Sequence, residues 1–403
     1  KIPRRKLRAG SSPALGTKCS KKIRDIISSM KKILVVFGTR PEAIKMAPLI
    51  LKLKEEGALD IKICVTGQHQ QMLKQVLRVF NIKPDFDLKV MKKSQNLEHI
   101  TSDILKKLSP IVDDFNPDLI LVHGDTTTTF AAALLSYYKK IKLGHVEAGL
   151  RTGNIYSPWP EEINRKFASI VSHLHFCPTE ISKKNLLNEG IDKNNIFITG
   201  NTVIDALMKS LKLIKTDNKI RSQIIRKLPQ IKDDKKIILV TGHRRESFGD
   251  GFKNICSALK EIAIQRDDVE IIYPVHLNPQ VQKPVLRELK GIDNIKLISP
   301  LDYLPFIFLM DKSYLILTDS GGVQEEAPSL GKPVLVMREV TERPEAVRAG
   351  TVKLTGPNKN QIVTNVMDLL DNKKLYRNMS EAHNPYGDGK ASDRILKNII
   401  NKL

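Results

Sequence analysis

The sequence predicts an α/β protein in which two doubly wound, Rossmann-like domains face a shared cleft. Short runs rich in Val, Ile and Leu recur along the 403 residues, with Lys-rich amphipathic segments between them. This alternation is typical of parallel strands that are buried on both faces by helices. The polar stretch 215–236 interrupts the alternation, which then restarts. Because a chain of this length fits two domains better than one, we place the domain boundary near this stretch.

Strands are expected in two sets, one on each side of that stretch. The first set comprises 33–37, 61–66, 119–122, 143–146 and 196–199. The second set comprises 237–241, 269–275, 295–298, 314–318, 334–337 and 351–354. From these sets we divide the chain into a basic tail (1–30), an N-terminal Rossmann-like domain with a carboxylate cluster (31–205), a C-terminal Rossmann-like domain (206–382) and a C-terminal helix that packs back on the first domain (383–403).

The composition excludes several classes of protein. Hydrophobic residues make up 41% of the chain and charged residues 27%, which is ordinary for a globular protein and rules out global disorder or a collagen-like repeat. No apolar run approaches the roughly 18 residues that a membrane-spanning helix needs. The four cysteines lie far apart without a CxxC pair, which argues against a zinc ribbon or a disulfide scaffold and favours a reducing cytoplasm.

The formal net charge of +22 should attract phosphate groups. Part of it lies in residues 1–30, which hold nine basic side chains and one acidic one and end in a methionine directly before a strong strand. We expect this tail to be an unstructured leader or a cloning remnant, with a targeting or nucleic-acid-binding segment as the alternative. The remaining charge is dispersed and aromatic residues make up only 5%, so a nucleic-acid-binding protein is the disfavoured hypothesis.

Both strand sets open with a strand, a glycine and a basic segment. In the first set, Gly38 is followed by Arg40 and by a proline suited to the first helical turn, and Lys45 lies one turn further on. The free N–H groups of such a turn, together with Arg40, would face an anion. The alternative is an ordinary strand-to-helix turn that binds no anion and leaves Arg40 on the surface, because such a turn has the same sequence pattern. In the second set, His243 directly follows the glycine.

Three carboxylates are expected at the edge of the first sheet. Asp125 directly follows a buried strand. Glu147 ends the next strand, and the period of two places His145 on the same face. Glu161 lies in a proline-started helix and shares a face with Arg165, four residues on. Such carboxylates could exchange protons with a carbon or oxygen acid. The alternative without a catalytic role is that His145 is a core histidine and Glu147 forms a salt bridge.

A phosphate cradle is expected in the second domain. Ser320, Gly321 and Gly322 lie between a strand and a helix, where backbone N–H groups can bind an anion. Glu326 lies one turn into that helix and could accept hydrogen bonds from ribose hydroxyls. The sequence contains neither a GxGxxG motif after a strand nor a Walker A loop. No His or Cys spacing predicts a metal site, and a metal held by the three carboxylates is the alternative.

These motifs resemble those of the non-hydrolysing UDP-N-acetylglucosamine 2-epimerases of bacteria. The resemblance runs from about Lys32 to Arg394 and rests on FGTRPEAIKMAPL, HGDTTTT, GHVEAGLRTG, SPWPEE, GNTVIDAL, TGHRRESFG, PVHLNP, TDSGGVQEEAPSLGKPVLVMR and TERPEA, in this order. It implies a GT-B-like fold, a homodimer and reversible C2 epimerisation of UDP-GlcNAc to UDP-ManNAc through 2-acetamidoglucal. The product would supply ManNAc units for surface polysaccharide. No nicotinamide or metal cofactor is implied.

The resemblance also implies roles for individual residues. It assigns UDP binding to Arg40, His243, Phe306, Ser320, Gly321, Gly322, Glu326 and Arg343. It places Lys45, Asp125, Glu147, Glu161 and Arg165 around the sugar, and it gives the chemistry to Asp125, Glu147, Glu161 and His243. Some members bind a second UDP-GlcNAc through a segment like 68–71, which makes Gln68 and Gln71 candidate allosteric residues, and through an arginine in the turn corresponding to 91–95. This chain has no arginine in that turn.

Two other enzymatic functions fit the same fold. A glycosyltransferase would pass the sugar from the nucleotide to an acceptor, and a hydrolase would release free ManNAc and UDP. The carboxylate cluster and the motifs are the features of the sequence that favour an epimerase over both.

Overall fold

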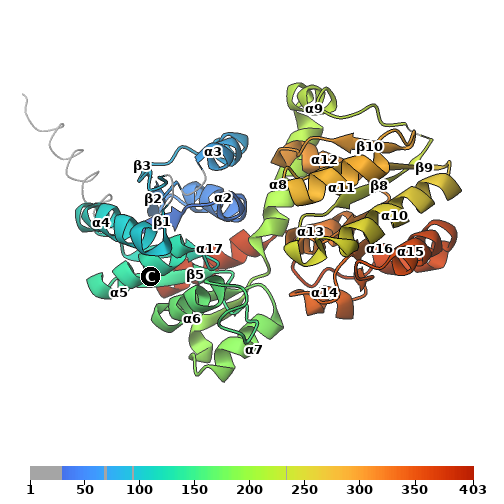
Figure 1. Cartoon of the computed structure of the whole chain (residues 1–403). Coiled ribbons are helices and arrows are strands. Elements are labelled where there is room, and N and C mark those ends of the chain that lie inside the picture. The colour runs from blue at the N-terminus through green and yellow to red at the C-terminus, as the bar shows by residue number, and fades with distance from the viewer. Residues whose placement is uncertain (1–29, 68–69, 93–94, 233) are drawn as a thin grey trace, which may run out of the picture.

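Two parallel sheets, each flanked by helices, make up the computed structural model, which describes residues 30–67, 70–92, 95–232 and 234–403 (Figure 1). The expected basic tail therefore lies, apart from residue 30, outside the described residues. The first sheet has seven strands in the order β3-β2-β1-β4-β5-β6-β7, and the second has six in the order β10-β9-β8-β11-β12-β13. These two sheets confirm the predicted fold class.

The strands follow the predicted pattern with two additions. The first sheet contains β1 (Lys31–Phe37), β2 (Leu59–Val65), β3 (Phe86–Asp87), β4 (Leu119–His123), β5 (Lys142–Val146), β6 (Leu174–Cys177) and β7 (Ile196–Ile198). The second contains β8 (Lys236–Thr241), β9 (Val269–Pro274), β10 (Ile295–Ile298), β11 (Leu315–Thr318), β12 (Val334–Val336) and β13 (Val352–Leu354). The sequence did not predict β3 or β6, because β3 is two residues long and β6, Leu-His-Phe-Cys, lacks the β-branched residues typical of strands.

Helices cover both faces of each sheet. On β1, Ile33, Val35 and Phe37 belong to one hydrophobic core, whereas Leu34 and Val36 belong to another on the opposite face. The helices of the first half are α2 (Arg40–Glu55), α3 (Gln70–Val79), α4 (Leu97–Phe115), α5 (Thr127–Lys139), α6 (Glu161–Val171) and α7 (Glu180–Asn188). The later helices are α8 (Thr202–Thr216), α9 (Asn218–Ile225), α10 (Asp250–Gln265), α11 (Pro279–Leu289), α12 (Tyr303–Lys312), α13 (Gly321–Glu326), α14 (Pro344–Arg348), α15 (Lys359–Asp371), α16 (Lys373–Ser380) and α17 (Ala391–Lys402). No helix among the described residues is long and apolar enough to cross a membrane.

The strand orders decide where a site can form. In the first sheet β1 lies between β2 and β4, and in the second β8 lies between β9 and β11. At such a reversal of strand order the loops after adjacent strands run to opposite faces and leave a crevice at the carboxyl edge. The candidate residues that follow β1, β4, β8 and β11 therefore lie beside these two crevices.

Two helices join the halves of the molecule. The long helix α8 stands between the two sheets and contacts α2 on one side and α12 and α13 on the other (Figure 1). The last helix, α17, returns to the first domain and packs against α2 and α8. Its N-terminus is held by Asp205 of α8, whose carboxylate accepts hydrogen bonds from the backbone N–H groups of Ala391 (3.1 Å) and Ser392 (2.7 Å). Its residues Ile395 and Ile399 belong to the same core as the apolar face of α2.

Candidate active site

A cavity of about 340 Å³ lies at the carboxyl edge of the first sheet. Its walls come from α2, from the segments that follow β4 and β5, and from the start of α6. The second domain closes it with Arg244 and with residues 342–345. Six of the predicted site residues line this cavity: Lys45, Asp125, Glu147, Glu161, Arg165 and Arg343.

Glu147 lies among charged and polar side chains. It follows β5 in a left-handed backbone conformation with φ of 63°, and its carboxylate accepts hydrogen bonds from Lys45 and from Asn201 Nδ2 (2.7 Å). Burial acts to raise the pKa of Glu147, but Lys45, together with His123 and Arg343, outweighs this effect and holds the pKa well below its usual range. Burial likewise acts to lower the pKa of Lys45, and Glu147 and Glu325 together reverse this effect and raise it. The pair is therefore ionised at neutral pH.

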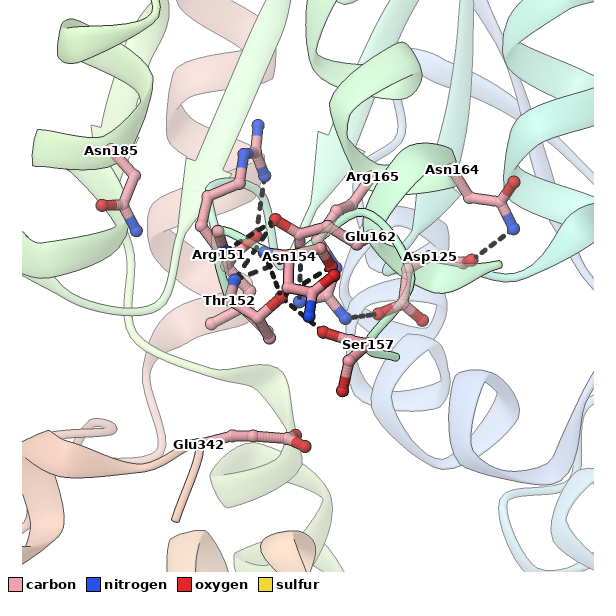
Figure 2. Close-up of polar contacts among 12 residues, drawn as sticks. Asp125, Arg151, Thr152, Asn154, Ser157, Glu162, Asn164, Arg165, Asn185 and Glu342 are labelled. Atoms are coloured by element: carbon pink, nitrogen blue, oxygen red, sulfur yellow. Dashed lines mark hydrogen bonds and ion pairs between the residues drawn. The ribbon is translucent and has the colours of Figure 1, made fainter. Parts of the chain in front are cut away.

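Asp125 has the opposite tendency. The guanidinium of Arg165 donates a hydrogen bond to its carboxylate, and Asn164 Nδ2 donates to its backbone carbonyl at 2.9 Å (Figure 2). Burial nevertheless raises the pKa of Asp125, because the favourable charge of Arg165 does not compensate for desolvation and Glu147 adds a like charge. The surroundings of the two carboxyl groups thus displace their pKa values in opposite directions, upward for Asp125 and downward for Glu147. Such a divergence is typical of an acid and a base that share one site.

Glu161 begins α6 and lines the cavity, half-buried. It makes no side-chain hydrogen bond or ion pair with another residue in the part of the chain that the structure describes. The i,i+4 spacing pointed to Arg165 as its partner, but the guanidinium of Arg165 instead faces Asp125 and Glu162, the latter at 3.4 Å. Glu162 is fully buried and accepts hydrogen bonds from the backbone N–H groups of Thr152 and Gly153, which anchors that loop (Figure 2).

His145 does not share the face of Glu147, as the period of two had suggested. β5 ends at Val146 and Glu147 has a positive φ, so the alternation of side chains between the two faces of the strand does not extend to Glu147. The imidazole of His145 is fully buried, and its Nε2 lies 2.7 Å from the carbonyl oxygen of Gly124. His145 is therefore a core histidine, and Glu147 alone enters the cavity.

A second group of predicted residues gathers at the carboxyl edge of the second sheet. The backbone N–H of His243 donates to Asp319 Oδ2 at 2.6 Å, and His243 Nδ1 lies 3.2 Å from Asp319 Oδ1. Ser320 follows directly and occupies the N-cap position of α13, where its side chain makes no capping hydrogen bond. A Cβ built on Gly321 would lie 3.6 Å from the guanidinium carbon of Arg343. Arg343 therefore adjoins both the cradle and the cavity. Gly322 is exposed beside it.

Glu326 lies one turn into α13, as predicted, and is 7% exposed. Burial raises the pKa of Glu326 to about 8, and the neighbouring Glu325 contributes in the same direction. Burial lowers the pKa of His243, although Asp319 opposes this shift. In this arrangement the cradle holds a neutral carboxyl and a largely neutral imidazole near neutral pH.

Other predicted residues lie elsewhere. Arg40 lines a separate cavity of about 450 Å³, which Tyr303 and Pro305 also line. Phe306 is half-buried on α12 and packs against the core of the second domain. The side chain of Gln71 and all of Gln68 lie outside the described residues. No group of three or more His, Cys, Asp or Glu side chains in the described ranges is arranged to hold a metal ion.

Sequence reasoning missed two residues that join the domains at this site. Asn201 Nδ2 donates to Glu147 and also to Glu325 of α13, the latter at 3.0 Å. The other carboxylate oxygen of Glu325 accepts a hydrogen bond from Arg343. Asn201 lies in the motif GNTVIDAL, where an asparagine before a helix reads as an ordinary N-cap, so nothing local signals its second contact.

Two facing doubly wound domains, with carboxylates in one half and, in the other, a cradle of backbone N–H groups beside Arg343, define a GT-B-like enzyme. The chain belongs to the UDP-N-acetylglucosamine 2-epimerase family, whose model matches residues 51–400. A UDP-N-acetylglucosamine 2-epimerase of Yersinia pestis is 58% identical over 370 residues, which are 92% of this chain and 98% of that protein.

Solved structures agree with this assignment. The structure of the UDP-GlcNAc 2-epimerase of Neisseria meningitidis bound to UDP-GlcNAc matches this chain with a TM-score of 0.85 and 52% sequence identity. The match covers 92% of this chain and 100% of that one. A glycotransferase of kitacinnamycin matches with a TM-score of 0.60 at 10% identity, over 93% of this chain and 99% of that one. This last similarity shows the fold alone.

Proposed function

We propose that the chain interconverts UDP-GlcNAc and UDP-ManNAc by eliminating UDP and adding it back to the resulting 2-acetamidoglucal. The observation that carries the mechanism is the opposite displacement of the pKa values of two carboxyl groups that line one cavity, Asp125 upward and Glu147 downward. A proton must leave C2 from one face and return on the other, and one carboxyl group does not easily serve both faces. Two carboxyl groups whose pKa values are displaced in opposite directions meet that need.

The steps balance as follows. As the C1–O bond to UDP breaks, the anomeric carbon gains oxocarbenium character, and the ionised Glu147 takes the C2 proton to form the C1–C2 double bond. Asp125 in its protonated form, which the upward displacement of its pKa favours, then delivers a proton to the opposite face of C2 while a UDP phosphate oxygen re-forms the bond to C1. In the reverse direction the two groups exchange roles. Glu161, half-buried at the rim of the cavity, is placed to relay protons between this pair and water.

The leaving diphosphate needs positive charge and N–H donors. Arg343 adjoins the N–H groups at the start of α13, and His243 lies beside the same loop. Stabilising charge as it develops on a leaving group typically contributes several kcal/mol to catalysis. That the Neisseria relative was solved with UDP-GlcNAc supports the same ligand here.

The experiment is proton NMR of UDP-GlcNAc with the protein in deuterium oxide. We expect UDP-ManNAc to appear with deuterium at C2 while the nucleotide-sugar pool stays intact. Accumulation of free UDP and ManNAc would instead identify a hydrolase, and turnover only after addition of an acceptor would identify a transferase. Retention of the original hydrogen at C2 would contradict proton exchange.

The oligomeric state, the location and the use of the product are parts of the same proposal. We infer a homodimer and a cytoplasmic location, with the product supplying ManNAc units for surface polysaccharide. Two exposed aromatic side chains, Tyr137 and Tyr138 of α5, offer apolar surface for a second copy, at 64% and 65% exposure. Light scattering after size exclusion tests the dimer: replacing both tyrosines with serine should yield monomers, and an unchanged mass would exclude this surface.

A further inference from the structure

Asn201 holds a position that an N-cap alone does not require. It is 3% exposed and stands immediately before α8, the helix that joins the two domains. Its side-chain oxygen accepts a hydrogen bond from the backbone N–H of Val203 at 3.1 Å, which is the capping contact. Its side-chain nitrogen donates to Glu147 of the first domain at 2.7 Å and to Glu325 of the second domain at 3.0 Å.

The orientation of this amide has only one solution. The backbone N–H of Val203 can face the oxygen of the amide but not its NH₂ group. If the amide were reversed, its oxygen would also face two carboxylates without a proton between them. Both N–H groups of Asn201 are therefore committed, one to each domain.

Asn201 is the neutral centre of a row of charges that crosses the domain boundary. Lys45 lies outside Glu147, and Arg343 lies outside Glu325, so the amide is flanked by two anions and each anion is flanked in turn by a cation. All these groups are nearly withdrawn from water, since the exposed fractions of the four charged side chains run from 1% to 14%. In such surroundings the loss of one partner is costly, because it leaves a buried charge uncompensated.

The two outer cations both belong to the candidate site. Lys45 lines the sugar cavity, and Arg343 adjoins the cradle for the diphosphate. If a diphosphate drew the guanidinium of Arg343 away from Glu325, the carboxylate of Glu325 would still accept the hydrogen bond from Asn201 Nδ2. The amide then transmits the position of Glu325 to Glu147, because the same nitrogen contacts both carboxylates.

We propose that Asn201 is a positioning residue that ties the proton-transferring carboxylate of Glu147 to the nucleotide-binding domain, so that Glu147 is placed for C2 only when the two domains are in contact. This inference rests on the proposed function. It assigns Asn201 no contact with the substrate. Its effect is to make proton transfer in one domain depend on the position of the other.

The decisive variant is Asn201→Asp, which keeps the shape and the capping oxygen but replaces two N–H donors by an oxygen. We expect kcat for epimerisation to fall at least about tenfold, since small displacements of a reacting group are costly in rate. UDP affinity by calorimetry should change less than twofold. The acid limb of the kcat–pH profile should move to higher pH, because a third carboxylate beside Glu147 raises its pKa. Asn358→Asp is the matched control, since Asn358 caps α15 at an exposed position and its side-chain oxygen accepts a hydrogen bond from the backbone N–H of Gln361.

A second variant keeps the test decisive if Asn201→Asp does not fold. Asn201→Ser retains a capping oxygen but removes both N–H donors without adding charge. It should lower kcat with a smaller displacement of the acid limb than the aspartate gives. Wild-type kcat and pH profile in either folded variant, or a loss confined to UDP affinity, would overturn the positioning role. Failure of the wild-type protein to place deuterium at C2 would instead overturn the proposed function, so the two outcomes are distinguishable.

Discussion

The hydroxyl of Thr126 donates a hydrogen bond to Glu42 Oε1 at 2.7 Å. The other oxygen of the same carboxylate accepts from the backbone N–H groups of Gly38 (3.0 Å) and Thr39 (2.7 Å), which closes a capping box at the start of α2. Glu42 therefore joins the helix that carries Lys45 to the loop that carries Asp125. Burial raises the pKa of Glu42, and these hydrogen bonds oppose that rise.

Replacing this carboxylate should weaken both the fold and the site. We expect Glu42→Ala to lower the free energy of unfolding by about 2 kcal/mol, because it removes a cap and leaves buried donors without an acceptor. Urea denaturation measures the change, and turnover at saturating substrate should fall with it. Glu98→Ala is the control, since Glu98 occupies the first turn of α4 but is exposed. An equal effect of the two variants would show that the link to Thr126 contributes nothing.

The three carboxyl groups of the cavity should be needed for turnover but not for nucleotide binding. We expect Asp125→Asn, Glu147→Gln and Glu161→Gln each to lower kcat by more than about a hundredfold, the lower end for loss of a general acid or base. UDP affinity by calorimetry should stay close to that of the wild type. If one variant keeps near-normal turnover, that residue is structural, and if two do, the carboxylate mechanism is wrong.

The neighbouring Glu162→Gln variant serves as a contrast to these three. Glu162 is buried against backbone N–H groups of the 152–153 loop rather than aimed at the substrate. Its replacement should lower the melting temperature by a larger amount than Glu161→Gln does.

Glu326 should make the protein less stable as the pH rises. Its pKa is about 8 when folded and has an ordinary value of 4.5, so its contribution to stability is complete below about pH 4.5 and is lost as the pH rises through about 8. Since one pKa unit corresponds to about 1.4 kcal/mol, the loss amounts to a few kcal/mol at most. Glu326→Gln mimics the protonated form. Its melting temperature should equal that of the wild type near pH 4 and exceed it at pH 8.5, whereas a constant difference would refute the shift.

The carboxylate of Asp205 should hold α17 in place. Asp205→Ala removes the acceptor of two backbone N–H groups at the start of that helix, and we expect a loss of about 1 to 2 kcal/mol in the free energy of unfolding. Hydrogen exchange should become faster in α17 before it does so in the sheets. Asp217→Ala is the comparison, because Asp217 caps the short helix α9 at the surface. Unchanged exchange in α17 would contradict the assigned role.

The sequence predicted the sheets well because buried parallel strands need continuous apolar runs, which are visible in one dimension. Runs such as Ile33–Phe37 mark β1, whereas β6 has too little β-branched character to be recognised. The residues that follow strands were also predictable, since the carboxyl ends of parallel strands meet at one edge. Asp125 and Glu147 therefore reach the same cavity.

Contacts that depend on backbone turns or on the approach of the two domains were not predictable. The positive φ of Glu147 separates it from His145, and no periodicity shows such a turn in advance. The ion pair of Arg165 with Asp125 in place of Glu161 depends on how α6 lies against the end of β4. The contact of Asn201 with Glu325 joins residues 124 positions apart and exists only because the domains meet.

The return of α17 to the first domain also affects the order in which the two domains can fold during synthesis on the ribosome. The strands of the first sheet are translated before any strand of the second, but the apolar face of α2 finds Ile395 and Ile399 only after the whole second domain has been made. Domains usually fold in the order in which they emerge. In this chain the second domain can complete its folding first. Until α17 leaves the exit tunnel, the apolar face of α2 in the first domain stays uncovered, and chaperones could bind it.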